Sequence, residues 1–128
     1  MTPENKSCPC DSTRNYQQCC GRLHAGVLAD DASSLMRSRY TAYVLCNEAY
    51  LLDTWHMRTR PRHISFDRQQ RWLGLKLVEA TLTGDAAAEV EFIARFRIGG
   101  ATATRLHERS RFVLDAGRWL YVDGDILE

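Results

Sequence analysis

The sequence predicts an α+β domain, with helices in its first half, an antiparallel sheet of about four strands in its second half, and a small metal-binding segment ahead of both. Three observations predict this order. Four cysteines fall within residues 8–20, a helical period of apolar residues begins near residue 33, and alternating segments separated by glycine turns run from residue 73 onward. We therefore expect a zinc knuckle over residues 1–26 and one folded domain over residues 30–128.

The cysteine cluster consists of Cys8, Cys10, Cys19 and Cys20. Two short ligand pairs joined by a loop are how a small peptide supplies the four soft ligands of a tetrahedral structural zinc site. We expect these side chains to hold one structural zinc ion. A pair of disulfides is the alternative, and the absence of a secretory signal argues against it because cytoplasmic thiols stay reduced.

The run from Cys8 to Gly21 resembles the SEC-C zinc motif, whose best-known copy ends the bacterial preprotein translocase motor. The resemblance implies the four cysteine ligands. Members of that family carry either cysteine or histidine at the position of Cys20, so the resemblance leaves His24 as an alternative fourth ligand.

This motif departs from the family pattern at several positions. Asp11 and Thr13 stand where glycine is usual, and Gln17 and Gln18 replace two common basic residues. The resemblance therefore does not carry over binding to acidic partners. A protein or peptide partner could still contact an exposed aromatic residue between cations, and such a surface would use Arg14, Tyr16, Arg22 and the backbone around Gly21. Alternatively, Tyr16 packs into the small core of the knuckle itself.

Length and composition limit the remaining possibilities. A chain of 128 residues with 45% apolar content builds one ordinary core. Its net charge of +1 provides no overall attraction to nucleic acid or to a membrane surface. No segment approaches the roughly 20 apolar residues of a membrane helix. We expect a soluble cytoplasmic protein with no membrane or nucleic-acid partner, and the oligomeric state stays open.

The helical region begins near Ser33, with Asp31 or Ser33 as its N-cap. Its apolar residues recur at helical spacing, and they are Met36, Tyr40, Tyr43, Val44, Leu51 and Trp55. Asn47 weakens the middle of this region, so the pattern fits either one long helix or two helices joined near Cys46–Asn47. We expect Cys46 to be a small buried residue rather than a reactive thiol. After the break at Pro61, a short third helix is expected over residues 66–72.

The sheet region contains four alternating segments. They are Leu73–Leu82, Ala88–Ile98, Thr102–Leu114 and Trp119–Val122. The separators are turn signals that can join antiparallel neighbours, and they are Gly84-Asp85, Gly99-Gly100 and Ala116-Gly117.

Alternation assigns the two faces of these strands. The core face of the second strand carries Val90, Phe92, Ala94, Phe96 and Ile98. In the third strand, Glu108 and Ser110 share a face with Leu106, Phe112 and Leu114. Because burying a lone carboxylate is costly, we expect Glu108 to be paired, hydrogen-bonded or lining a wet cavity. The opposite face carries cations that can pair with Glu89 or Glu91, and these are Arg105, His107, Arg109 and Arg111.

Helices packed into a curved sheet of this order resemble the cone-shaped NTF2-like fold. A finer resemblance links the chain to a bacterial YchJ-like family, which places a SEC-C motif before such a domain. The segments that carry the resemblance are 35–40, 54–56, 72–75, 107–112 and 119–124. It implies the fold and the metal site, and no established activity. Many members continue into a second SEC-C motif, and since this sequence ends at Glu128, we do not expect binding through two paired knuckles.

Two classes of function follow from these features. The first is an interaction or ligand-binding module in which the knuckle contacts a partner or the cone holds a small molecule. The second is a small-molecule enzyme that uses Glu108 and His56 as an acid–base pair, although no residue is assigned as catalytic and we favour the non-enzymatic class. The candidate pocket comprises Trp55, His56, Trp72, Phe96, Glu108, Ser110, Trp119, Tyr121 and Asp123.

Overall fold

A computed structural model describes residues 7–127 of the protein. Its helical elements are a short 3-10 helix η2 (Tyr16–Gln18) and the helices α1 (Cys20–His24), α2 (Ala32–Val44) and α3 (Glu48–Asp53). Its strands are β1 (Gln70–Gly84), β2 (Ala87–Ile98), β3 (Thr104–Asp115) and β4 (Arg118–Ile126). The strands form one antiparallel sheet in the order β1-β2-β3-β4, which confirms the α+β class and the four-stranded meander.

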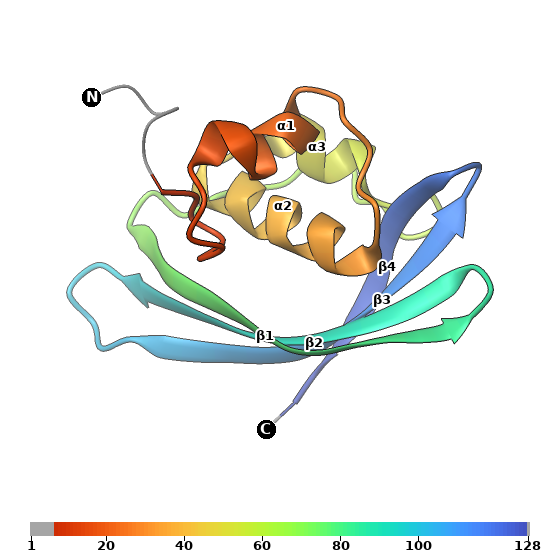
Figure 1. Ribbon diagram of the computed structural model, residues 1–128. Helices are drawn as coiled ribbons and strands as arrows, with labels where there is room; N and C mark the ends of the chain where they lie inside the picture. Colours follow the sequence, from red (N-terminus) through yellow and green to blue (C-terminus); the bar gives the residue numbers. More distant parts are fainter. Residues whose placement is uncertain (1–6, 128) are drawn as a thin grey trace.

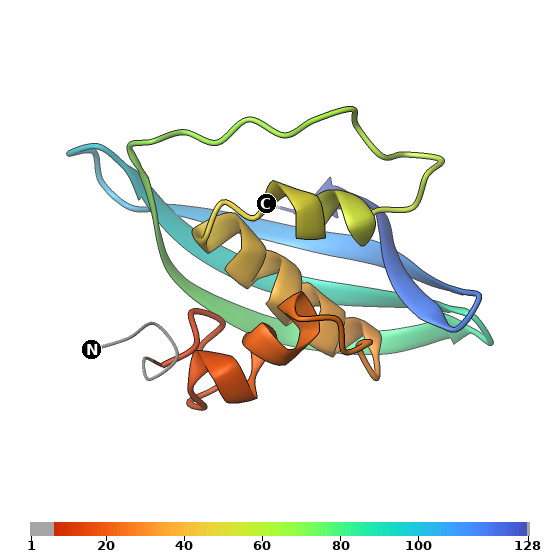
Figure 2. The same ribbon diagram turned by 90° about the horizontal axis from the view of Figure 1, so that it is seen from above.

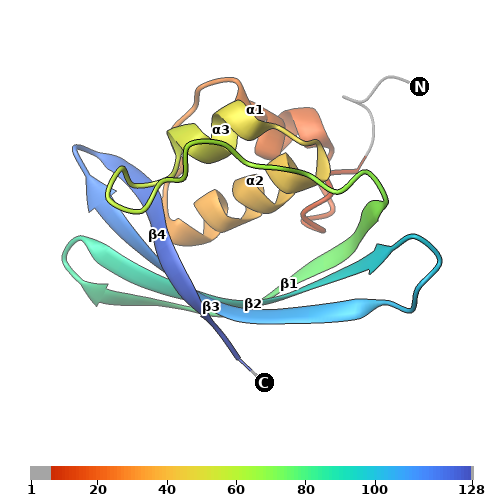
Figure 3. The ribbon, with the colours of Figure 1, turned by 180° about the vertical axis from the view of Figure 1, so that it is seen from behind.

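The helices lie together on the concave side of the strongly curved sheet (Figure 1). The carboxyl end of the chain emerges on the opposite, convex side, which is clear from behind (Figure 3). Seen from above, α2 runs between the N-terminal knuckle and the long segment that connects α3 to β1 (Figure 2). Helix α2 therefore contacts the knuckle on one side and the sheet below it. No helix within residues 7–127 has both the length and the apolar character that crossing a membrane requires.

Capping residues set the ends of the two main helices. The carboxylate of Asp31 accepts a hydrogen bond from the Ser34 amide at 2.8 Å, so Asp31 is the N-cap of α2. The side chain of Asn47 caps α3 in the same way, accepting from the Tyr50 amide at 3.1 Å. Two helices, and not one long helix, therefore fill the region.

The prediction that Cys46 is buried was wrong. Cys46 lies in the turn between α2 and α3 with a left-handed backbone (φ 56°), and its side chain is exposed. A left-handed residue commonly ends a helix, and the chain leaves the packed layer at that point. Its exposure therefore follows from the turn and not from the helical period.

The expected third helix over residues 66–72 was also wrong. The carboxylate of Asp67 accepts from the Gln69 amide at 2.8 Å, and its carbonyl accepts from the Gln70 amide at 3.1 Å. This turn leads directly into β1, where Trp72 pairs with Phe96 on β2. Seven residues are too few for periodicity to separate helix from strand, and pairing across the sheet decides the outcome.

The inner face of the sheet follows the predicted alternation. Val90, Phe92 and Ala94 on β2 are buried, although Ile98 at the end of the strand is 42% exposed. On β3, Ser110 and Phe112 are buried and Glu108 lies on the same face, pairing with Phe92 in register. The curvature of the sheet thus brings a carboxyl group into the concave interior.

The outer face carries the expected ion pairs. His107 and Arg109 both contact the carboxylate of Glu91, at 2.7 and 2.9 Å. Arg111 differs from the expectation, because it pairs with the carboxylates of Asp123 and Asp125 on β4 at 2.6 and 2.7 Å. These contacts join neighbouring strands across a partly exposed face, where solvent screens each pair and its contribution to stability is small.

Candidate metal centre and ligand cavity

The four knuckle cysteines converge on one point. The sulfur atoms of Cys8, Cys10, Cys19 and Cys20 all lie within 4.8 Å of one another, and each side chain is at most 5% exposed. A tetrahedral zinc site with Zn–S bonds of about 2.3 Å places its sulfurs about 3.8 Å apart. The Cys10–Cys19 and Cys19–Cys20 sulfur distances are 3.5 and 4.0 Å. All four are free thiols, so no disulfide joins them.

The backbone folds tightly to achieve this convergence. The amide of Cys8 donates to the carbonyl of Arg14 at 2.8 Å, which closes the loop between the two cysteine pairs. Gly21 directly follows the second pair, and a Cβ atom there would lie 2.7 Å from the carbonyl oxygen of Tyr16. Only glycine permits this close approach of α1 to η2, which sets the position of Cys19 and Cys20.

Hydroxyl groups surround the sulfurs. Thr41 on α2 is fully buried and donates to the sulfur of Cys20 at 3.2 Å, and its oxygen lies 3.7 Å from the sulfur of Cys8. The hydroxyl of Ser12 lies 3.0 Å from the sulfur of Cys19. Hydrogen bonds donated to sulfur favour the thiolate, which is the form that binds metal. The cluster therefore has the donor set and the polar surroundings of a metal centre.

Hydrogen bonds among the thiols shift the pKa values of Cys8 and Cys20 in opposite directions. Hydrogen bonds with the Cys10 and Cys20 thiols lower the pKa of Cys8 to about 3. The matching contacts with Cys10 and Cys8, together with burial, raise the pKa of Cys20. One thiolate is thus accommodated by its neighbours, whereas four thiolates in this space require a positive ion among them.

His24 lies outside the group of four sulfurs. Its Nδ1 atom accepts from the Tyr16 hydroxyl at 2.8 Å, and its Nε2 atom donates to the Ser38 carbonyl at 2.8 Å. Burial lowers the pKa of His24, which favours this neutral form. Both ring nitrogens are therefore engaged elsewhere, and the half-buried Tyr16 belongs to the interior of the knuckle.

Two further contacts attach the knuckle to the domain. Arg37 on α2 donates to the carbonyl of Cys10 at 2.6 Å, and the amide of Leu75 on β1 donates to the carboxylate of Asp11 at 3.1 Å. Neither Arg37 nor Thr41 was among the predicted site residues. They lie four residues apart and therefore share one face of α2, and this spacing was the available signal.

The backbone of the knuckle predicts opposite effects for two glycine substitutions. Thr13 is exposed and left-handed (φ 70°), a conformation that is strained for a β-branched residue. We expect Thr13→Gly to raise the free energy of unfolding by about 0.5–1 kcal/mol. Asp11 is also left-handed (φ 63°), but Asp11→Gly removes the hydrogen bond to Leu75 and should lower stability by about 1 kcal/mol. Thermal unfolding of the metal-loaded proteins measures both, and equal signs would contradict the assignment.

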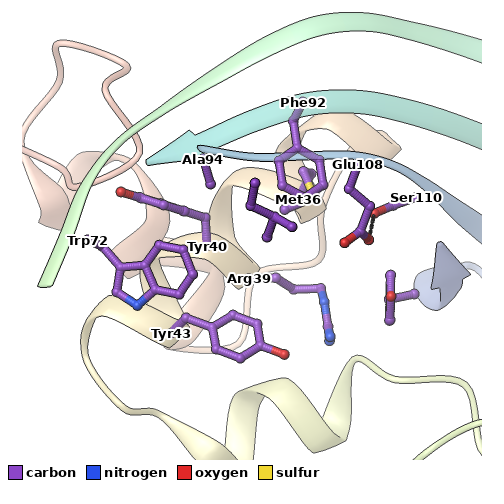
Figure 4. Close-up of a pocket in the computed structure, with 11 residues that line it drawn as sticks. Met36, Arg39, Tyr40, Tyr43, Trp72, Phe92, Ala94, Glu108 and Ser110 are labelled. Atoms are coloured by element: carbon purple, nitrogen blue, oxygen red, sulfur yellow. Dashed lines mark hydrogen bonds between the residues drawn. The ribbon is translucent and has the colours of Figure 1, made fainter. Parts of the chain in front are cut away.

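A cavity of about 260 Å³ lies between α2 and the concave face of the sheet (Figure 4). Four predicted pocket residues line it: Trp72, Glu108, Ser110 and Tyr121. The remaining lining residues were not predicted as pocket residues, and they are Met36, Arg39, Tyr40, Tyr43, Phe92, Ala94 and Leu106. Most of these come from α2, whose inward face covers the sheet.

The other five predicted pocket residues do not line this cavity, and three of the five are aromatic. Trp55 packs edge-on against the ring of Tyr121, with centroids 5.0 Å apart. Phe96 packs beside Trp72 at 5.4 Å. Trp119 lines a different hollow near α1 and α3. These aromatic residues surround the site without forming its wall.

The predicted approach of His56 to Glu108 does not occur in the cavity. The amide of His56 donates to the carbonyl of Tyr121 at 2.8 Å, and its Nδ1 atom accepts from the Arg58 amide at 3.0 Å. His56 therefore lies at the margin of β4, outside the set of lining residues. Its ring is used to stabilise the turn that follows Trp55.

Asp123 lies on the outer face of the sheet, contrary to the pocket prediction. Between β3 and β4, Phe112 pairs with Tyr121 whereas Arg111 pairs with Asp123, so Val122 is an extra residue in β4. Such a bulge reverses the alternation, because one inserted residue moves every later side chain to the other face. Asp123 consequently pairs with Arg111 at 2.6 Å.

Arg39 is the most unusual residue of the cavity wall. Its side chain is only 3% exposed, and its Nη1 atom donates to the carbonyl of Leu51 at 2.8 Å and to the hydroxyl of Thr54 at 2.7 Å. The guanidinium lies 4.5 Å from the ring centroid of Tyr121. Burial lowers the pKa of Arg39 to about 10, so it remains a cation at neutral pH. Its helical spacing from Met36 and Tyr43 was the signal that it points inward.

Helices on the concave face of a curved four-stranded sheet, preceded by a four-cysteine knuckle, define an NTF2-like domain carrying a SEC-C-type motif. Residues 31–124 match the family described as "YchJ, middle NTF2-like domain". The chain belongs to this YchJ-like bacterial family.

Relatives and solved structures agree with this assignment. A UPF0225 protein of Xanthomonas oryzae pv. oryzae is 52% identical over 121 residues, covering 93% of this chain and 94% of the relative. A UPF0225 protein of Bordetella pertussis is 54% identical over 123 residues, covering 93% and 92%.

Two solved structures share the whole architecture. The solution structure of a SEC-C motif containing protein from Rhodopseudomonas palustris is 34% identical with a TM-score of 0.83, covering 94% of this chain and 98% of that one. The crystal structure of a SEC-C motif containing protein from Psychrobacter arcticus is 26% identical with a TM-score of 0.83, covering 100% and 86%. The arrangement of knuckle and cone is therefore similar in both.

Proposed function

We propose that this protein is a zinc-stabilised ligand-binding module. One structural zinc ion is held by Cys8, Cys10, Cys19 and Cys20, and a small molecule binds in the cavity under α2. The observation that carries this proposal is the double role of α2. Its Thr41 side donates to the sulfur of Cys20, whereas its Arg39 and Tyr43 side lines the cavity. The metal centre thus fixes the helix that forms one wall of the ligand site.

The charges around the knuckle support a filled zinc site. Zinc with four thiolates carries two negative charges in excess, because each thiolate contributes one. Arg14, Arg22 and Arg37 border a small hollow beside Cys19 and Cys20. The positive charges of these arginines offset the excess negative charge of the site. A reducing compartment such as the cytoplasm keeps the thiols available for the metal.

The two alternative roles have less support. A partner surface on the knuckle was expected to use Tyr16, whose hydroxyl is instead bonded to His24 inside the knuckle. An enzyme was expected to use Glu108 with His56, and His56 is bonded outside the cavity. A binding cavity with one buried cation and one carboxylate needs neither feature.

Native mass spectrometry tests the metal part of the proposal. Protein purified under reducing conditions should carry one zinc ion per chain, and Cys19→Ser should carry none. Cys46→Ser is the matched control, because Cys46 is exposed and lies outside the cluster. Zinc retained in full by Cys19→Ser, or lost equally from both variants, would refute the assigned ligands.

A further inference from the structure

The cavity has two chemically different ends. Trp72, Tyr40 and Tyr43 form an aromatic end, where a flat molecule can lie against their rings (Figure 4). Arg39 and Glu108 reach toward the other end from opposite walls, the first from α2 and the second from β3. Its volume of about 260 Å³ lies just below the roughly 300 Å³ at which pockets for drug-sized ligands begin. The space therefore suits a molecule of one or two rings.

Arg39 supplies hydrogen-bond donors at the polar end. Both hydrogen bonds of its guanidinium, to Leu51 and Thr54, use the same nitrogen, Nη1. No ion pair joins Arg39 to a carboxylate among residues 7–127. A buried cation without a contacting anion has lost hydration that an acceptor group can replace. A ligand oxygen beside Arg39 would do so.

Glu108 supplies an acceptor opposite this donor. One carboxylate oxygen, Oε2, accepts from the Ser110 hydroxyl at 2.7 Å, and Ser110 is only 1% exposed. Gly124 on β4 makes room for the carboxylate, because a Cβ atom there would collide with Oε2. The other carboxylate oxygen, Oε1, has no hydrogen-bond partner among the described residues. The carboxylate is thus positioned by its neighbours and faces the cavity.

The two charges select against ions. Arg39 and Glu108 act on each other across the cavity without touching, and their charges sum to zero. A ligand anion is attracted by Arg39 and repelled by Glu108. A ligand cation is attracted by Glu108 and repelled by Arg39. A neutral group with an adjacent acceptor and donor satisfies both side chains at once. A carboxamide or a lactam is such a group.

We infer that the cavity binds a small, neutral, planar ring compound that carries an amide or lactam edge. The carbonyl oxygen accepts from Arg39, the N–H group donates to Glu108, and the ring lies among Trp72, Tyr40 and Tyr43. This inference rests on the proposed function, since it names the ligand class of the same cavity. The site would then select its ligand through the two opposite charges of Arg39 and Glu108 together, and not through a single ion pair with the ligand.

Three ring compounds of nearly equal shape test this ligand class on the zinc-loaded protein: benzamide, benzoate and benzylamine, which are neutral, anionic and cationic. Heteronuclear NMR reports binding through the indole N–H of Trp72, with that of Trp119 in the other hollow as internal reference. We expect benzamide to shift the Trp72 signal. The affinity of each ion should be lower than that of benzamide by roughly tenfold or more.

The outcomes separate the ligand class from the proposed function. If the affinity of benzoate or benzylamine, measured through the Trp72 signal, equals or exceeds that of benzamide, the inferred ligand class is wrong and the ligand-binding function stands. If none of the three shifts Trp72 at millimolar concentration, the inference and the ligand-binding function both fail. The zinc count is measured separately and is unaffected by either result.

Two variants test the role of the carboxylate. Glu108→Gln keeps the side-chain shape and removes the negative charge, so we expect roughly tenfold weaker benzamide binding and stronger benzoate binding. Gly124→Ala should displace the same carboxylate and weaken benzamide binding as well. Glu79→Gln on the exposed part of β1 is the control and should change neither probe. The inference would be overturned if Glu108→Gln bound the three probes in the same order of affinity as the parent protein, at an unchanged melting temperature.

Discussion

Replacing Cys19 with serine is expected to abolish zinc binding and to unfold the knuckle from residue 8 to residue 24. Structural zinc contributes roughly 10–16 kcal/mol of apparent binding free energy in isolated zinc-finger peptides, where it substitutes for a hydrophobic core. Here the four cysteines are themselves the buried centre of the knuckle. Without the metal, the segment loses the interaction that closes it.

The loss should extend into the domain, because the knuckle is attached to it. Thr41 and Arg37 on α2 would lose their contacts with Cys20 and Cys10, and Asp11 would lose its contact with β1. We expect a lower melting temperature, and faster hydrogen exchange in residues 8–24 than in the sheet. Chelation of the metal from the unmodified protein should produce the same result. A chelated protein with unchanged exchange in residues 8–24 would contradict a structural role.

Replacing Arg39 with methionine is expected to lower the free energy of unfolding by about 3 kcal/mol. The substitution removes two hydrogen bonds from a charged donor, of about 1.5–3 kcal/mol each, and a cation–π contact of about 1–2 kcal/mol. Methionine also avoids the free-energy cost of burying a charged group, which offsets part of this loss. The carbonyl of Leu51 near the end of α3 would also lose the cation that satisfies it.

Chemical denaturation measures this change, with Arg97→Met as the control. Arg97 is an exposed arginine on β2, and its replacement should alter stability by no more than about 0.5 kcal/mol. An Arg39→Met protein that is as stable as the parent would show that desolvation cancels the contacts of Arg39. Stability would then not explain why a cation occupies this wall, and ligand binding would be its remaining role.

Local sequence patterns predicted most of the fold. The spacing of the cysteines identified the knuckle, and alternation along β3 placed Glu108 on the inner face with Ser110. Both signals work because they depend on neighbours within one segment, where backbone geometry fixes the direction of each side chain. The missed bulge at Val122 shows the limit of such signals, since it arises only when β4 pairs with β3.

Apart from the third helix expected over residues 66–72, local patterns were sufficient for the order of the main helices and strands, the four cysteines of the candidate metal centre and the inward direction of Glu108. The packing of distant segments was needed to show that Thr41 contacts the cluster, that Arg39 faces Glu108 across a cavity, and that His56 lies outside it. Periodicity fixes the face of a residue only within its own element. Which distant residue meets that face depends on how α2, the knuckle and the sheet pack together, and no local pattern contains that information.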